Sequence, residues 1–144
     1  MIDSMDDMLW TLNPQNDSME KTILRMKEYA EAIQNTFPTQ VSMEVDEKVN
    51  QLKLDMKVRH ELFLIFKKTL RAIAEEANNS VSMVSIDHAG KKLAIKIQNN
   101  EVSFSSAVAQ TVSKEIKQRA NIINAESDIQ NDSKGVSFIL LVSL

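Results

Sequence analysis

Glycine is scarce in this sequence. It supplies 2 of the 144 residues, whereas average usage is about 7%. Loops that cradle phosphates need glycine where the backbone approaches the ligand closely or adopts a strained conformation. Gly90 and Gly135 stand alone, and neither a GxGxxG nor a GxxxxGK[ST] motif occurs. A glycine-rich phosphate-binding loop is therefore excluded.

Other absences narrow the class of protein. Without cysteine there is no disulfide and no thiolate metal ligand. Apolar runs such as residues 136–144 are too short for a transmembrane helix, and the acidic start at residues 1–7 is unlike a signal peptide. The formal net charge is -3 with both signs mixed along the chain, so no basic patch predicts a nucleic-acid partner. We expect a soluble cytosolic domain with no nucleic acid partner and no direct membrane contact.

Residue chemistry alone predicts no catalytic or metal site. The hydrophobic content of 43% suits one globular domain with a real core. The only histidines, His60 and His88, have no second ligand or nucleophile at workable spacing. Carboxylates such as Asp128 lack an apolar setting that would prepare them for acid or base catalysis.

The first predicted helix spans residues 17–37. Asp17 and Glu20 have the spacing of a capping box, apolar residues follow at helical spacing, and Pro38 ends the helix. Apolar residues then alternate over residues 41–45, which predicts a strand.

The second half of the chain predicts a hairpin, a helix and a final strand. Apolar residues alternate on both sides of the turn His88-Ala-Gly-Lys, where Gly90 supplies the permissive turn residue. Helical spacing continues over residues 108–123. After a polar segment, residues 136–144 predict a closing strand with apolar residues on both faces.

Between these halves, a polar connection over residues 47–53 and an N-cap at Asp55 precede a helix over residues 59–77, RHELFLIFKKTLRAIAEEA. Its apolar residues recur at three- and four-residue steps and form one broad stripe, which predicts packing on a large surface. On its charged side, Arg71 and Glu75 have the i,i+4 spacing of an exposed ion pair.

This helix resembles the N-box helix of sensor histidine kinases, of which RRNLFLIFKEALNNIVKH is a typical form. Residues 10–20, WTLNPQNDSME, resemble the segment of that family that closes the dimerisation hairpin and opens the catalytic domain of the GHKL ATPase class. The resemblance continues in order to the strand Leu93-Ala-Ile-Lys-Ile and the closing strand. It implies an α/β (α+β) two-layer sandwich, in which a mixed, mostly antiparallel sheet has helices on one face.

The resemblance also implies a division of the chain. Residues 1–13 would be the end of a dimerisation helix, and residues 14–144 the histidine-kinase ATPase-like domain. In the family the phospho-acceptor histidine lies upstream, so we expect a longer sensor. Trp10 is expected to pack between the two parts. The short apolar stripe of the helix end predicts a monomer or a weak homodimer, and it consists of Ile2, Met5, Leu9 and Leu12.

The nucleotide-binding motifs of the family are altered in the helix. Lys68 stands where the family has the N-box glutamate, and Ala72 where it has the magnesium-binding asparagine. Glu75 and Glu76 stand where it has lysine and histidine. A lysine about 5 Å from a divalent ion would repel it by roughly 7 kcal/mol at an effective dielectric near 20.

The glycine boxes are altered as well. The family's Asp-Asn-Gly-Lys-Gly-Phe box is Asn99-Asn100-Glu101-Val102-Ser103-Phe104, without the adenine-reading aspartate and both glycines. The second box, usually GNGL, aligns with residues 110–113, QTVS, and the late Gly-Thr pair with Gly135-Val136.

We therefore predict a degenerate ATPase-like domain of a two-component sensor that binds no ATP, needs no cofactor and has a structural or regulatory role. Its partners would be other domains of a longer sensor or a response regulator, in the cytosolic portion of a membrane-bound protein. Two alternatives stay open: a divergent, active kinase domain that binds ATP with magnesium, and an anti-sigma-factor-like protein-binding module. The vestigial nucleotide-pocket positions are Lys68, Ala72, Glu75, Glu76, Asn99, Asn100, Glu101, Ser103 and Phe104.

Overall fold

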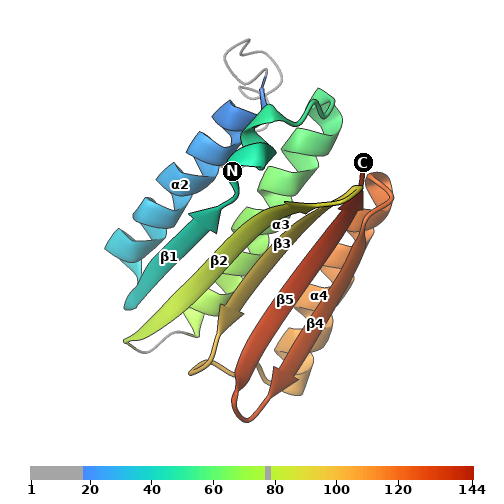
Figure 1. Cartoon of the computed structure of the whole chain (residues 1–144). Helices are drawn as coiled ribbons and strands as arrows, with labels where there is room; N and C mark the ends of the chain where they lie inside the picture. The colour runs from blue at the N-terminus through green and yellow to red at the C-terminus, as the bar shows by residue number, and fades with distance from the viewer. Residues whose placement is uncertain (1–17, 77–78) are drawn as a thin grey trace.

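A computed structural model describes residues 18–76 and 79–144 of the chain. These residues form two layers, in which the helices cover one face of a single sheet (Figure 1). The elements in chain order are α2 (Met19–Thr36), β1 (Thr39–Val45), the 3-10 helix η2 (Glu47–Gln51), α3 (Met56–Glu75), β2 (Ser80–Ala89), β3 (Lys92–Asn99), α4 (Ser106–Ile122), β4 (Glu126–Asp132) and β5 (Gly135–Ser143).

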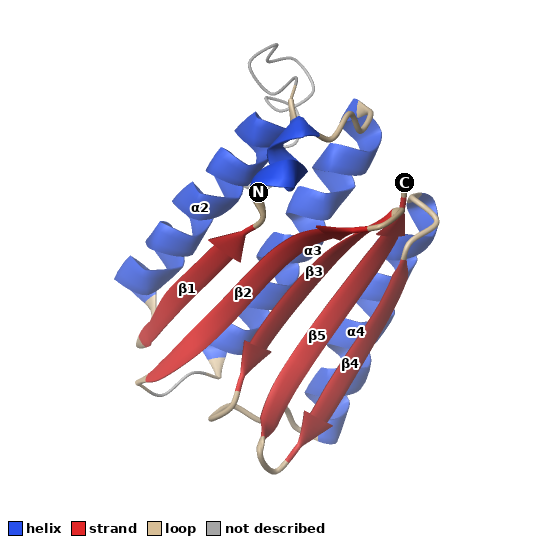
Figure 2. Cartoon of the chain, viewed as in Figure 1, coloured by secondary structure: helices blue, strands red, loops and turns tan. Residues whose placement is uncertain are grey.

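The sheet is mixed and mostly antiparallel, as the sequence predicts. Its five strands lie in the order β1-β2-β3-β5-β4. β1 pairs with β2 in parallel, and the other three neighbouring pairs are antiparallel. β1 and β4 are therefore the two edges, and the helices of the described residues lie on the same side of the sheet (Figure 2).

The core lies between the helices and the sheet. Side chains alternate along the strands, so that Ile86, Ile95 and Leu140 are buried beneath the helices. The apolar stripe of α3 packs onto them and includes Phe66, which is 0% exposed. Burying such a side chain stabilises the fold by about 1.5–3 kcal/mol. The opposite face of the sheet is more open, and Met83 on β2 is 47% exposed.

The helix starts are partly as predicted. Asp55 is the N-cap of α3 and accepts a hydrogen bond from the backbone N of Val58 at 2.9 Å, which confirms the prediction. The prediction for α2 was wrong by one residue, because Ser18 is its N-cap and accepts from the backbone N of Lys21 at 3.2 Å. Either side chain has the required oxygen, so the residue types at 17 and 18 do not decide between them.

Two elements were missed. The polar connection over residues 47–53 contains η2, capped by Asp46, whose Oδ1 accepts from the backbone N of Lys48 at 3.1 Å. The polar segment before the last strand is itself the edge strand β4. Leu144, predicted as the last residue of the closing strand, lies beyond β5 and is 43% exposed.

The predicted dimerisation-helix end over residues 1–13, the contact of Trp10 and most of the phrase at residues 10–20 lie outside the described residues. None of the helices that the structure describes combines the length and the apolar character that a membrane span requires.

Candidate functional site

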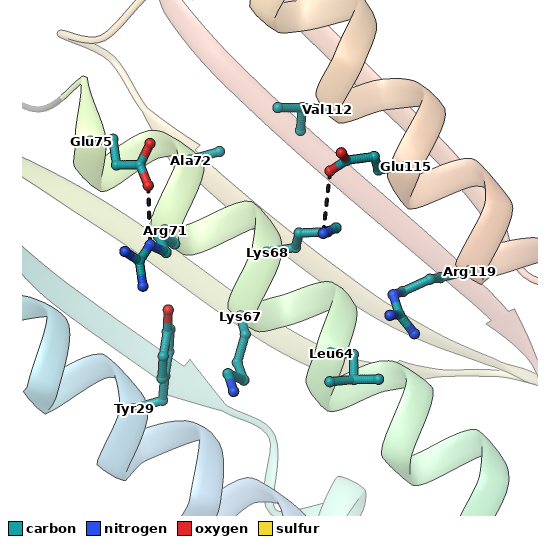
Figure 3. Close-up of a pocket in the computed structure, with 10 residues that line it drawn as sticks. All are labelled: Tyr29, Leu64, Lys67, Lys68, Arg71, Ala72, Glu75, Val112, Glu115 and Arg119. Carbon is teal, nitrogen blue, oxygen red and sulfur yellow. Dashed lines mark hydrogen bonds and ion pairs between the residues drawn. The ribbon is translucent and has the colours of Figure 1, made fainter. Parts of the chain in front are cut away.

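A groove runs over the outward side of α3, where α2 and α4 flank it (Figure 3). Its volume is about 510 Å³. Three of the predicted nucleotide-pocket positions, Lys68, Ala72 and Glu75, line it together because they lie one turn apart along α3. We call it the α3 groove. Its other lining residues are Tyr29, Leu64, Lys67, Arg71, Val112, Glu115 and Arg119.

Lys68 bridges α3 to α4. Its Nζ lies 3.3 Å from Oε2 of Glu115, and the two side chains are 41% and 44% exposed (Figure 3). The lysine charge is thus paired across the groove, at the position that the sequence resemblance aligned with the N-box glutamate. Such exposed pairs contribute at most about 1 kcal/mol, so Glu115 positions the lysine more than it stabilises the fold.

Further along α3, the groove contains the predicted ion pair. Nε of Arg71 donates to Oε1 of Glu75 at 3.0 Å, which confirms the i,i+4 interpretation. Glu75 therefore points along its own helix toward Arg71 (Figure 3). Glu76, the next predicted site residue, is the exposed C-cap of α3 and is not a lining residue of the groove.

Further contacts of the groove could not be found from sequence spacing. Arg119 of α4 donates to Oε2 of Glu61 on α3 at 3.0 Å, and the Glu61 side chain is 12% exposed. Nζ of Lys67 lies 5.4 Å from the ring centre of Tyr29, within the range of a cation–π contact. The Arg119–Glu61 hydrogen bond joins residues 58 positions apart, so no local pattern predicts it.

Asn99, which the resemblance aligned with the adenine-reading aspartate, uses its side chain in internal hydrogen bonds. It lies at the end of β3 and is 1% exposed. Its Nδ2 donates to Oγ of Ser80 at 2.8 Å and to Oγ of Ser82 at 3.2 Å. Its Oδ1 accepts from the backbone N of Glu101 at 2.9 Å. Oγ of Ser82 lies 3.1 Å from Oγ1 of Thr39, so the network spans three strands.

The rest of the altered glycine box is held against β4, away from the α3 groove. Oδ1 of Asn131 accepts a hydrogen bond from the backbone N of Phe104, and Nδ2 of Asn131 donates one to the carbonyl O of Phe104, both at 2.8 Å. The hydroxyl of Ser103 donates to the carbonyl O of Asp132. Phe104 is buried, whereas the side chain of Asn100 is exposed. The structure thus separates these predicted site residues from Lys68 and Ala72.

Gly135 has a packing role. Its φ is +145°, and a Cβ at this position would lie 2.6 Å from the carbonyl O of Asn99 and 2.7 Å from the Cα of Asn100. Only glycine allows the start of β5 to approach the end of β3 this closely. Its partner in the predicted Gly-Thr pair, Val136, is a buried core residue.

The residues that the resemblance aligned with the second glycine box form regular helix. Residues 110–113 lie within α4, which begins at Ser106 with Ser105 as its N-cap. The backbone N of Val108 is bonded to the Ser105 hydroxyl at 3.2 Å, and the Thr111 hydroxyl donates to the carbonyl O of Ala107 at 3.0 Å. The backbone groups that a lid loop would turn toward a ligand are therefore used within the helix.

Comparisons with known proteins identify the fold. No protein-family model matches the sequence, and no curated protein matches it either. Among solved structures, the blue-light activated histidine kinase of Erythrobacter litoralis EL346 superposes with a TM-score of 0.70 at 12% identity, over 88% of this chain and 45% of that chain. This chain thus corresponds to under half of that kinase.

The catalytic domain of histidine kinase ThkA, in a nucleotide-free form, matches with a TM-score of 0.66 at 11% identity, over 88% of this chain and 92% of that one. ThkA in complex with response regulator protein TrrA matches with a TM-score of 0.65 at 13% identity, over 88% of this chain and 40% of that chain. The described residues therefore have the fold of histidine kinase catalytic domains, the α/β sandwich that the sequence predicts.

Proposed function

We propose that this chain is a degenerate histidine-kinase ATPase-like domain that has lost nucleotide binding and has a structural or regulatory role in a two-component sensor. The observation that carries the proposal is the state of Asn99. Its amide group is buried and makes three hydrogen bonds to Ser80, Ser82 and Glu101. The side chain at the adenine-reading position therefore serves the sheet, and it offers no free carboxylate to a base.

The charges in the α3 groove support the same proposal. Lys68 places an ammonium group where the related kinases carry the N-box glutamate, and Glu115 pairs with it at 3.3 Å. Ala72, one turn along α3, offers a methyl group where those kinases bind magnesium through asparagine. Together, the cation and the missing ligand oppose a magnesium–triphosphate complex at this position.

The α4 segment supports the loss of a lid. In the related kinases a glycine-rich loop covers the phosphates, whereas residues 110–113 of this chain are helical. Forming such a loop would require breaking the first turns of α4, which are capped by Ser105 and buried at Val112. We infer that a fixed helix stands where those kinases have a mobile cover for the nucleotide.

The proposed setting follows from the relatives. ThkA is known in complex with a response regulator, and we infer that the partners of this chain are a response regulator or the other domains of a longer sensor. We also propose that the chain lies in the cytoplasmic portion of a membrane-bound sensor. A fold that keeps its frame while its ligand-binding positions change suits a domain selected for contacts with other domains.

Thermal unfolding with and without magnesium-ATP tests the proposal. A ligand that binds only the native state raises the Tm, so we expect the same Tm at every nucleotide concentration, with magnesium alone as the matched control. A Tm that keeps rising with the logarithm of the magnesium-ATP concentration, while magnesium alone leaves it unchanged, would instead establish a divergent ATP-binding domain.

A further inference from the structure

A second groove lies at the edge of the sheet, between α4 and the edge strand β4. Its volume is about 780 Å³. Phe104, Ala109 and Ile129 give it an apolar lining, and Lys114 and Lys117 of α4 add two positive charges. We call it the edge groove. It is separate from the α3 groove, with which it shares no lining residue.

The strand beside this groove, β4, is an edge strand. β4 is the last strand of the sheet and is paired on one side, with β5, within the described residues. Its outer edge therefore presents a row of backbone N–H and C=O groups. In Figure 1, α4 lies directly behind this edge, so an extended segment placed alongside β4 would have a helix on one side and solvent on the other.

The two faces of β4 differ in charge. Ser127, Ile129 and Asn131 are half-buried and alternate with exposed residues along the strand. Ile129 and Asn131 line the edge groove on the α4 side. Because side chains alternate across a strand, the exposed residues face the open side of the sheet. They are acidic or amide side chains, namely Glu126, Asp128, Gln130 and Asp132.

We propose that the edge groove binds an extended segment of a partner protein, which adds to the sheet beside β4. Alternate side chains of this segment would enter the groove, where acidic ones meet Lys114 and Lys117 and an apolar one meets Ile129. The side chains between them would lie on the open face beside Glu126 and Asp128, where basic residues are favoured. The surface thus selects a strand that alternates acidic and basic residues.

A second copy of the chain does not satisfy this pattern. If β4 paired with β4 of another molecule, acidic side chains of both strands would meet on the open face, and like charges opposite each other destabilise a strand pair. The acidic residues therefore protect the edge against self-association while they attract a basic face. The partner is a different segment with complementary charges.

Hydrogen bonds fix one end of the edge groove. The two hydrogen bonds between Asn131 and the backbone of Phe104, both 2.8 Å, fix the loop at one end of the groove. Phe104 is 6% exposed and belongs to the core. A loop held in this way has little to order on binding, which favours recognition of a short segment.

The test uses the capped peptide acetyl-KEKVKEK-amide, in which glutamate and valine share one face and lysine the other. We expect the amide NMR signals of Ile129 and Gln130 and of Lys114 and Lys117 to shift on titration. In an added strand, the N–H groups that meet β4 belong to alternate residues. One of two control peptides, N-methylated at either the odd or the even positions, should therefore lose binding while the other keeps it.

A pair of double variants tests the charges. Lys114→Ala with Lys117→Ala should raise the Kd of the peptide about fivefold, the effect of losing two exposed ion pairs. The matched control, Lys21→Ala with Lys27→Ala on α2 at the other edge of the sheet, should leave it unchanged. Alanine favours helix in both variants, and circular dichroism verifies the fold. Equal binding of both methylated peptides, an unchanged Kd in the first variant, or shifts confined to other regions would overturn the proposal.

Discussion

Replacing Asn99 by alanine tests whether its side chain stabilises the fold. The substitution removes three hydrogen bonds, of 2.8, 3.2 and 2.9 Å, from a side chain that is 1% exposed. Each such bond contributes about 1 kcal/mol net. The free energy of unfolding should therefore fall by about 3 kcal/mol, because the hydroxyls of Ser80 and Ser82 also stay buried with fewer partners. The Tm should fall by roughly 10 °C.

Urea unfolding followed by circular dichroism measures this change, and Asn100→Ala is the matched control. Asn100 is the adjacent residue and has an exposed side chain, so the same substitution there should alter the free energy of unfolding by less than about 0.5 kcal/mol. A loss below about 1 kcal/mol for Asn99→Ala would refute the reasoning, since the buried network would then not support the junction of the strands.

Two further substitutions follow from the geometry, and urea unfolding measures both. Gly135→Ala should lower the free energy of unfolding by at least about 3 kcal/mol, because the new Cβ would lie 2.6 Å from the carbonyl O of Asn99. Its control, Gly90→Ala, should lower it by about 1–2 kcal/mol, since Gly90 has φ +60° but no atom within 4 Å of the new Cβ. Equal losses for the two variants would contradict the close approach at Gly135. Lys68→Ala should cost less than about 1 kcal/mol, and a double-mutant cycle with Glu115→Ala that shows a coupling well above this value would contradict the exposed character of the pair.

The helices and strands that could be predicted from the sequence are those whose signals lie within a few residues of one another. The β2–β3 hairpin has alternating apolar residues and a glycine in its turn, and Gly90 has φ +60° in the structure. The apolar stripe of α3 and its cap at Asp55 are likewise within a few residues of each other. Arg71 and Glu75 were predicted to pair because a helix alone brings such residues together.

β4 was missed because an edge strand with one open face buries little. Its sequence, ESDIQND, contains Ile129 as its one large apolar residue, and that residue is half-buried. Pairing with β5 holds it in place, and this information lies in the partner strand. Single-chain periodicity therefore indicated a polar connection.

From the sequence, only the site residues on one helix could be predicted to lie together. Lys68, Ala72 and Glu75 share a face of α3 and line one groove, but Lys68 pairs with Glu115 of a different helix. Asn99 was assigned by resemblance to a ligand-binding position, and its hydrogen bonds to Ser80 and Ser82 depend on the register of β2 and β3. Such contacts arise from the tertiary fold and have no sequence spacing of their own.

A calorimetric titration of magnesium-ATP into the natural chain and into a repaired variant tests the central claim most directly. The variant carries Lys68→Glu, Ala72→Asn, Asn99→Asp and Glu101→Gly, and circular dichroism establishes that it folds. The account predicts no saturable heat with the natural chain and measurable binding by the folded variant, because the frame is kept and the separate ligand terms are restored together. A saturable isotherm with the natural chain would contradict the account.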